Sequence, residues 1–78
     1  MTRYYFDIRD GGGLYPDEEG LEFKTQSEAE IEAAHSLANL ARDLTTVGGR
    51  TDVAVEVRTE GGPIFQAALI FETCKTKQ

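Results

Sequence analysis

The chain opens with an alternation of apolar and polar side chains, the pattern of a half-buried β-strand. Tyr4, Phe6 and Ile8 fall on one side of this strand and form its predicted inner face. Asp10 and the three glycines after it supply a backbone-bonding side chain and residues that tolerate positive φ. We therefore expect the chain to reverse direction after the first strand.

The return of the chain is less regular than its start. Pro16 lacks an amide donor, and the run at 17–20 has the composition of a turn. Leu14 and Tyr15 could begin the return, but a regular strand is better placed at 21–24, where apolar residues resume. The sequence predicts a short or bulged second strand.

A helix is predicted over residues 27–45. Ser27 followed by Glu30 fits a capping box, in which the two side chains satisfy free amides at the helix start. Apolar residues then recur at intervals of three and four, the spacing of one helix face, which assigns Glu32 and Ser36 to the solvent side. The predicted inner positions are Ile31, Ala34, Leu37, Ala38, Ala41 and Leu44.

Two later stretches return to a period of two and predict a hairpin. Val53, Val55 and Val57 alternate with smaller or polar residues, and the glycines and proline at 61–63 favour a turn. In the last strand, 64–72, one side is expected to face the core, and it consists of Phe65, Ala67, Leu69 and Phe71. The other side carries Ile64, Gln66, Ala68 and Ile70.

The element order β-β-α-β-β predicts an α+β fold with two layers, a four-stranded, mainly antiparallel sheet and one helix packed on one face. Residues 1–73 form the predicted domain, and 74–78 are expected to be a loose polar tail. The predicted core consists of Tyr4, Phe6, Ile8, Leu21, Phe23, Ile31, Ala34, Leu37, Ala38, Ala41, Leu44, Val53, Val55, Val57, Phe65, Leu69 and Phe71.

Charge and cysteine content narrow the function classes. The 78 residues carry 8 Lys plus Arg against 14 Asp plus Glu, a net charge of −6, which repels nucleic-acid backbones and anionic membranes. Cys74 is the only cysteine, so no intrachain disulfide can form. The start of the chain has no signal-peptide pattern, and the apolar run at 67–71 is too short to span a bilayer. We expect a cytoplasmic protein.

Several segments together resemble a known group of proteins. The opening Arg3-Tyr4-Tyr5-Phe6-Asp7-Ile8-Arg9-Asp10-Gly11, the turn Asp17-Glu18-Glu19-Gly20-Leu21-Glu22 and the helix at 28–44 resemble a family of small bacterial proteins of unknown function. This resemblance implies a compact soluble protein and brings no catalytic or binding residue with it. At the level of the fold, the chain is also similar to HicB-type antitoxin domains.

The residues that carry chemistry are scattered. His35 is the only histidine, so neither a zinc pair nor a histidine relay is available. Cys74 is expected to be unreactive, because its neighbour Lys75 would point the opposite way along a strand or lie in the loose tail. The carboxylates between Asp10 and Glu19 could in principle bind a cation, although their spacing does not match a calcium loop. We predict no catalytic, metal or cofactor-binding residue, and no enzyme activity.

The predicted function is therefore a protein-protein interaction or self-association module. One helix covers one sheet face, and the opposite face is expected to carry an apolar patch that would form a homodimer interface. This patch consists of Tyr5, Ala54, Ile64, Ala68 and Ile70. The alternative is a single-stranded RNA or antitoxin-like role on the same face, through Tyr5 with its arginines, which Asp7 and Glu56 would largely neutralise.

Overall fold

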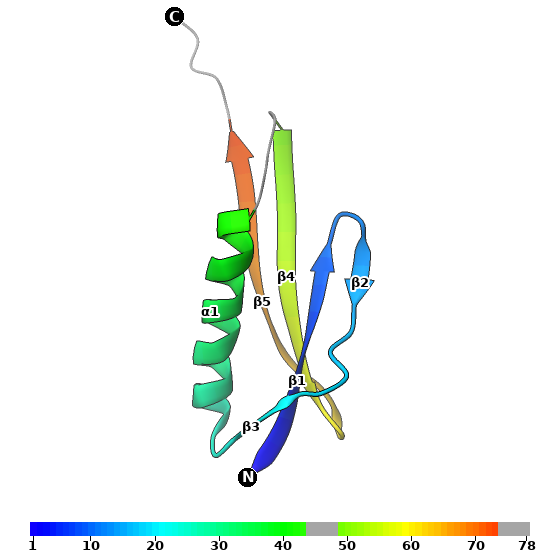
Figure 1. Cartoon of the computed structure of the whole chain (residues 1–78), viewed down its shortest axis with the longest axis vertical. Coiled ribbons are helices and arrows are strands. Elements are labelled where there is room, and N and C mark those ends of the chain that lie inside the picture. The colour runs from blue at the N-terminus through cyan, green and yellow to red at the C-terminus, as the bar shows by residue number, and fades with distance from the viewer. Residues whose placement is uncertain (44–48, 74–78) are drawn as a thin grey trace, which may run out of the picture.

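The computed structural model describes residues 1–43 and 49–73 and confirms an α+β fold of one helix and an antiparallel sheet (Figure 1). The predictions for Leu44, Cys74 and the tail at 74–78 lie outside the described residues, as does the side chain of Phe71. In chain order, the elements are β1 (Thr2–Asp10), β2 (Gly13–Tyr15), β3 (Leu21–Phe23), α1 (Gln26–Asp43), β4 (Gly49–Thr59) and β5 (Gly62–Thr73).

The return strand is split into two pieces that pair with opposite ends of β1. β2 pairs with Ile8–Asp10 and β3 pairs with Thr2–Tyr4, both antiparallel. Between them Pro16 and the acidic residues interrupt the ladder, so the predicted single short strand becomes two strands of 3 residues each. The sheet order is β2-β1-β4-β5, with β3 also on β1.

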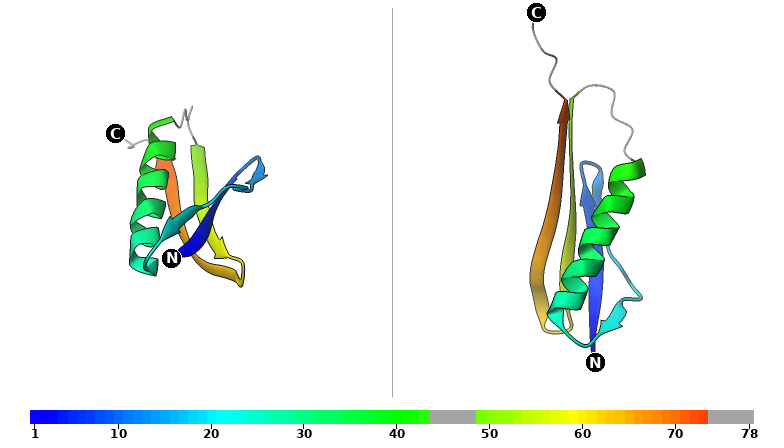
Figure 2. Two further views of the ribbon diagram at one scale, coloured as in Figure 1. Left: turned by 60° about the horizontal axis from the view of Figure 1, so that its bottom comes forward. Right: turned by 90° about the vertical axis from the view of Figure 1, so that its left-hand side faces the viewer.

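The central strands place two sets of side chains on opposite faces of the sheet. β1 pairs with β4 so that Phe6 faces Val57 and Ile8 faces Val55, and β4 continues into the β4–β5 hairpin. The helix lies across the face that carries these residues (Figure 2). In the right-hand view of Figure 2, β5 forms one margin of the sheet.

The core lies between α1 and the centre of the sheet. Val55 and Val57 are fully buried, and Tyr4 and Phe6 join them from β1. Phe23 packs against both of these aromatic rings at centroid distances of 6.2 Å, with the Phe6 pair edge-on. Burial of such side chains contributes about 1.5–3 kcal/mol each, so these few residues dominate the stability of a small domain.

The predicted inner face of the helix is wrong except at Leu37, which packs against the core as expected. Ile31 is 58% exposed, and Ala34 and Ala38 are exposed as well. The buried face instead carries Ala29 and Ala33. Leu37 and Leu40 pack against the core on this face, and Glu32 and Ser36 are half-buried rather than solvent-facing.

Aromatic side chains from the sheet explain this rotation. Tyr4, Phe6 and Phe23 fill the space beneath the first turns of α1, which leaves room there only for alanine methyl groups. The spacing of Ala29, Ala33, Leu37 and Leu40 also fits one helix face, and it places both leucines inside. Leu21, another predicted core residue, is 48% exposed because β3 lies at the margin of the sheet.

The start of the helix is capped two residues earlier than predicted. Thr25 Oγ1 accepts the Glu28 amide at 3.2 Å, and Glu28 Oε1 accepts the Thr25 amide at 3.2 Å. These reciprocal bonds form a capping box at Thr25 and Glu28 rather than at Ser27 and Glu30. The short connection from β3 fixes this choice, since Glu28 also accepts the Lys24 amide at 2.9 Å.

Candidate functional site

The face of the sheet opposite α1, here called the open face, gathers the side chains that point away from the core. They come from alternate positions of the three long strands, because successive side chains of a strand point to opposite sides. On β1 they are Arg3, Tyr5, Asp7 and Arg9, and on β4 they are Asp52, Ala54, Glu56 and Arg58. On β5 they are Ile64, Gln66, Ala68 and Ile70.

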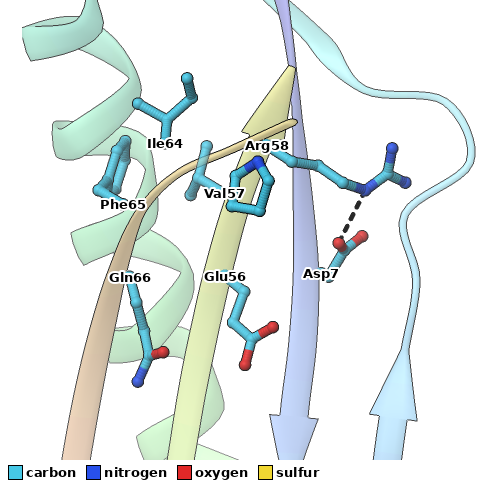
Figure 3. A pocket seen from close by; sticks show the side chains of 8 residues that line it. Asp7, Glu56, Val57, Arg58, Ile64, Phe65 and Gln66 are labelled. Atoms are coloured by element: carbon cyan, nitrogen blue, oxygen red, sulfur yellow. Dashed lines mark hydrogen bonds and ion pairs between the residues drawn. The ribbon is translucent and has the colours of Figure 1, made fainter. Parts of the chain in front are cut away.

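Asp7 is the centre of a polar network on this face and is only 7% exposed. Arg58 Nε donates to Asp7 Oδ2 at 2.8 Å, and the Asp17 amide donates to Asp7 Oδ1 at 2.8 Å. Arg58 also donates from Nη2 to the carbonyl oxygen of Asp17 at 3.0 Å. Figure 3 shows Arg58 extended across β1 towards the loop that contains Asp17. The network fixes the acidic loop, residues 16–20, against β1.

The carboxylate of Asp17 occupies the gap between β2 and β3. Its Oδ2 accepts the Phe6 amide at 3.1 Å, and its Oδ1 accepts the Glu19 and Gly20 amides at 3.0 and 3.1 Å. Partial burial would raise the pKa of Asp17, but these amide bonds and the charge of Arg58 lower it below its usual value. Asp17 therefore replaces the strand that is missing at this point of the β1 edge.

The three arginines that the structure describes on the open face, Arg3, Arg9 and Arg58, are already paired. The Arg58 guanidinium lies 4.5 Å from the centre of the Tyr5 ring, so it covers the ring while it binds Asp7. Arg9 Nε binds Glu56 at 2.5 Å, and Arg3 binds Glu22 at 2.9 Å. The hydrogen bond to Asp7 raises the pKa of Arg58, against partial desolvation. The described side chains of this face therefore offer little unpaired positive charge to a phosphate backbone.

The carboxylates of the first turn serve as hydrogen-bond acceptors. Asp10 accepts the Gly12 amide at 2.7 Å, and Asp7 and Asp17 hold the acidic loop. No group of at least three His, Cys, Asp or Glu residues suited to a metal ion occurs in the described part of the chain. His35 is exposed on the helix, away from the open face. The polar groups that the structure brings together therefore have a local role in folding.

The residues predicted for the interface fall into separate groups. Ala54 and Ala68 are cross-strand partners and, with Ile70, line a hollow of about 400 Å³. Ile64 lines a second hollow of about 370 Å³. Between the two groups, Glu56 is paired with Gln66, and Tyr5 lies under Arg58. The apolar side chains thus follow β5 along its length and do not form one patch across the sheet.

The outer edge of β5 is the feature that the sequence reasoning missed. β5 has 12 residues and is the last strand in the sheet order, and no described strand pairs with its outer side. The signal was present in the sequence, because no charged residue stands between Glu60 and Glu72. An edge strand with a long uncharged segment is a template for pairing with another chain.

The comparisons with known proteins identify the family of this chain. A family model, Domain of unknown function (DUF6894), matches residues 3–70 of the 78, and the chain belongs to this family. The match confirms the resemblance to a family of unknown function, while the similarity to HicB-type antitoxins stays a prediction. No match was found among curated proteins or among solved structures. Within the described residues, no helix is long and apolar enough to cross a membrane.

Proposed function

We propose that this protein is a non-catalytic self-association module that forms a homodimer through β5 and the open face beside it. The observation that carries the proposal is the exposure of two isoleucines on this strand, Ile64 at 42% and Ile70 at 57%. Large aliphatic side chains scattered singly on a surface are ordinary. Here they lie on one strand that carries no charge before Glu72 and whose outer edge has no partner among the described strands, which is typical of an interface.

The energetics show what such a dimer requires. Each isoleucine is already about half-buried, so covering the rest contributes on the order of 1 kcal/mol per side chain. Two copies bring four of these side chains, whereas association costs about 4–15 kcal/mol in lost translational and rotational freedom. The isoleucines therefore need further contacts beside them. The unpaired backbone groups along β5 are the nearest source of such contacts.

Size-exclusion chromatography with light scattering tests the proposal at micromolar concentration. We expect a mass near twice the chain mass of 8.6 kDa. Ile70→Asp should raise the dimer dissociation constant at least tenfold, because it buries an unpaired carboxylate. Ile31→Asp is the matched control, because Ile31 is 58% exposed on the outer side of α1. A wild-type mass near 8.6 kDa, or loss of the dimer only in Ile31→Asp, would contradict the proposal.

Single-stranded RNA binding is the second candidate, and the aromatic ring of Tyr5 among three arginines on the open face favours it. Because Arg3, Arg9 and Arg58 are ion-paired, we expect at most weak retention on RNA. A binding measurement near 0.15 M salt separates the two candidates. Tight binding that weakens steeply with added salt would favour the RNA role over the self-association module.

A further inference from the structure

The outer edge of β5 lacks the devices that keep edge strands from pairing. Natural edges are blunted by short strands, charged side chains, proline or bulges. β5 is 12 residues long, and its only proline, Pro63, stands at its start. The register shift in the β4–β5 hairpin falls at Val57/Arg58, opposite that same end. From Ile64 to Ile70 the edge is uncharged and regular.

We infer that β5 pairs antiparallel with β5 of a second copy about a two-fold axis at Ala67, so that the two sheets become one continuous sheet. This inference rests on the proposed self-association and adds its geometry. A two-fold axis between neighbouring antiparallel strands stands perpendicular to the sheet and keeps both helices on the same face. Two residues that lie directly opposite each other must then point to the same face of the joint sheet. Even-numbered residues of β5 share one face and odd-numbered residues share the other, so the two residue numbers of every opposed pair have the same even sum.

The sequence of β5 selects the register among these options. Its uncharged segment is nearly palindromic in hydrophobicity about Ala67, with isoleucine three residues away on either side. In the register centred on Ala67, Ile64 of each copy lies opposite Ile70 of the other. Directly opposed side chains have Cβ atoms about 4.5–5.5 Å apart, so the exposed isoleucines cover one another twice. The register centred on Gln66 places each Ile70 opposite Gly62, and the register centred on Ala68 places it opposite Gln66.

The burial of the core-facing side chains of β5 also points to a missing neighbour strand. Val53, Val55 and Val57 on β4 are buried. Phe65 and Leu69, which face the helix side from β5, are only half-buried. The inferred register places Phe65 of one copy opposite Leu69 of the other. The strand that fits this edge is therefore one with apolar residues on both faces, and β5 itself has this pattern.

The distribution of charge favours contact between two copies of this chain at the uncharged segment of β5. The chain carries a net charge of −6, so two copies repel each other over most of their surface. The stretch between Glu60 and Glu72 is the longest in the sequence without a charged residue. Pairing of this stretch with itself opposes no like charges, because the inferred register keeps both glutamates at the ends of the joint ladder.

Cysteine cross-linking tests both the pairing and its register. In a Cys74→Ser background, Gln66→Cys and Ala68→Cys are prepared as separate proteins; both side chains are exposed on the open face. The inferred register places position 66 of one copy opposite position 68 of the other, about 4.5–5.5 Å apart at Cα, within disulfide range. The same position in two copies lies diagonally, at about 7–8 Å.

We expect oxidation of the equimolar mixture to give at least tenfold more covalent dimer than either variant alone, measured by intact mass. Efficient linking of either variant with itself would overturn the register. A wild-type protein that is dimeric by light scattering but gives no linked species in any sample would overturn the edge pairing and leave the proposed function standing. A wild-type protein that is monomeric would overturn both.

Discussion

The two sides of this sheet, along β1 and along β5, differ in what covers the outward-facing backbone groups of the strand. The outer side of β1 is covered at both ends by strands of 3 residues, and the Asp17 carboxylate accepts the Phe6 amide between them. The outer side of β5 runs for 12 residues with no described strand beside it. One edge is closed by the chain itself, and we propose that the other is closed by a second copy.

The difference between the two edges reflects where the charged side chains of this domain lie. The buried carboxylate of Asp7, its partner Arg58 and the carboxylate of Asp17 all act on the β1 side. β5 receives no charged side chain before Glu72. In a chain with so many carboxylates, the uncharged edge of β5 differs from the rest of the surface. We therefore propose that self-association takes place at this edge.

Removal of the Asp7 carboxylate should have the largest effect on the closed edge. In Asp7→Ala, the Asp17 amide and Arg58 lose their acceptor, and the acidic loop loses its attachment to β1. We expect the free energy of unfolding to fall by about 2–4 kcal/mol, measured by urea denaturation. Asp7→Asn keeps an acceptor oxygen and should cost roughly half as much. Equal losses in both variants would show that the charge, rather than the acceptor, holds the loop.

Gly20→Ala should have the next largest effect. Gly20 has a φ of 74°, and a Cβ there would lie 2.9 Å from Arg3 Cγ and 3.0 Å from the Tyr4 carbonyl oxygen. Backbone strain and this contact should cost about 1–3 kcal/mol of stability. Gly11→Ala is the control, because a Cβ at Gly11 would meet nothing within 4 Å. A cost at Gly11 as large as at Gly20 would contradict this account of the loop.

The closed edge should also depend on pH through Asp17. Its folded pKa lies below the usual 3.8, so its stabilisation is complete above that value. The stabilisation is lost as pH falls from about 3.8 through the lower folded pKa, because the unfolded state then binds the proton more readily. Asp17→Asn should be about 1–2 kcal/mol less stable at pH 7, with a shallower decline below pH 4. An unchanged decline, measured by urea denaturation across this range, would contradict the role given to Asp17.

The strands were predictable because their alternation depends only on which side faces the core. Tyr4, Phe6 and the three valines of β4 are buried as expected. The helix was predictable in extent but not in rotation, because apolar residues follow two of its faces. The choice between those faces is made by the aromatic rings of the sheet, which only tertiary packing brings beneath Ala29 and Ala33.

The polar network was beyond sequence reasoning for a related reason. Asp17 and Arg58 are far apart in the chain and meet only because β1 lies between the acidic loop and β4. The composition of the acidic loop predicted a turn and carried no sign that one carboxylate would cap the edge of a strand. The free edge of β5 was different, since the absence of charge along it is visible in the sequence.

A charge placed on the open edge should have the smallest effect on the stability of the single chain. Gln66 is exposed on the open face, so Gln66→Lys should change the free energy of unfolding by less than about 0.5 kcal/mol at concentrations where the dimer is absent. At higher concentration it should weaken the dimer severalfold by charging the edge. A large loss of stability in dilute solution would show that this edge already makes stabilising contacts within the single chain.

Hydrogen exchange as a function of protein concentration compares the two edges most directly. We expect the outward-facing amides of β5 between Ile64 and Ile70 to exchange fast in dilute solution and to become at least tenfold more protected as concentration rises through the dimer range. The Phe6 amide, which Asp17 already accepts, should not change. Protection of β5 that is independent of concentration, in a protein that dimerises, would contradict the claim that a second copy closes this edge.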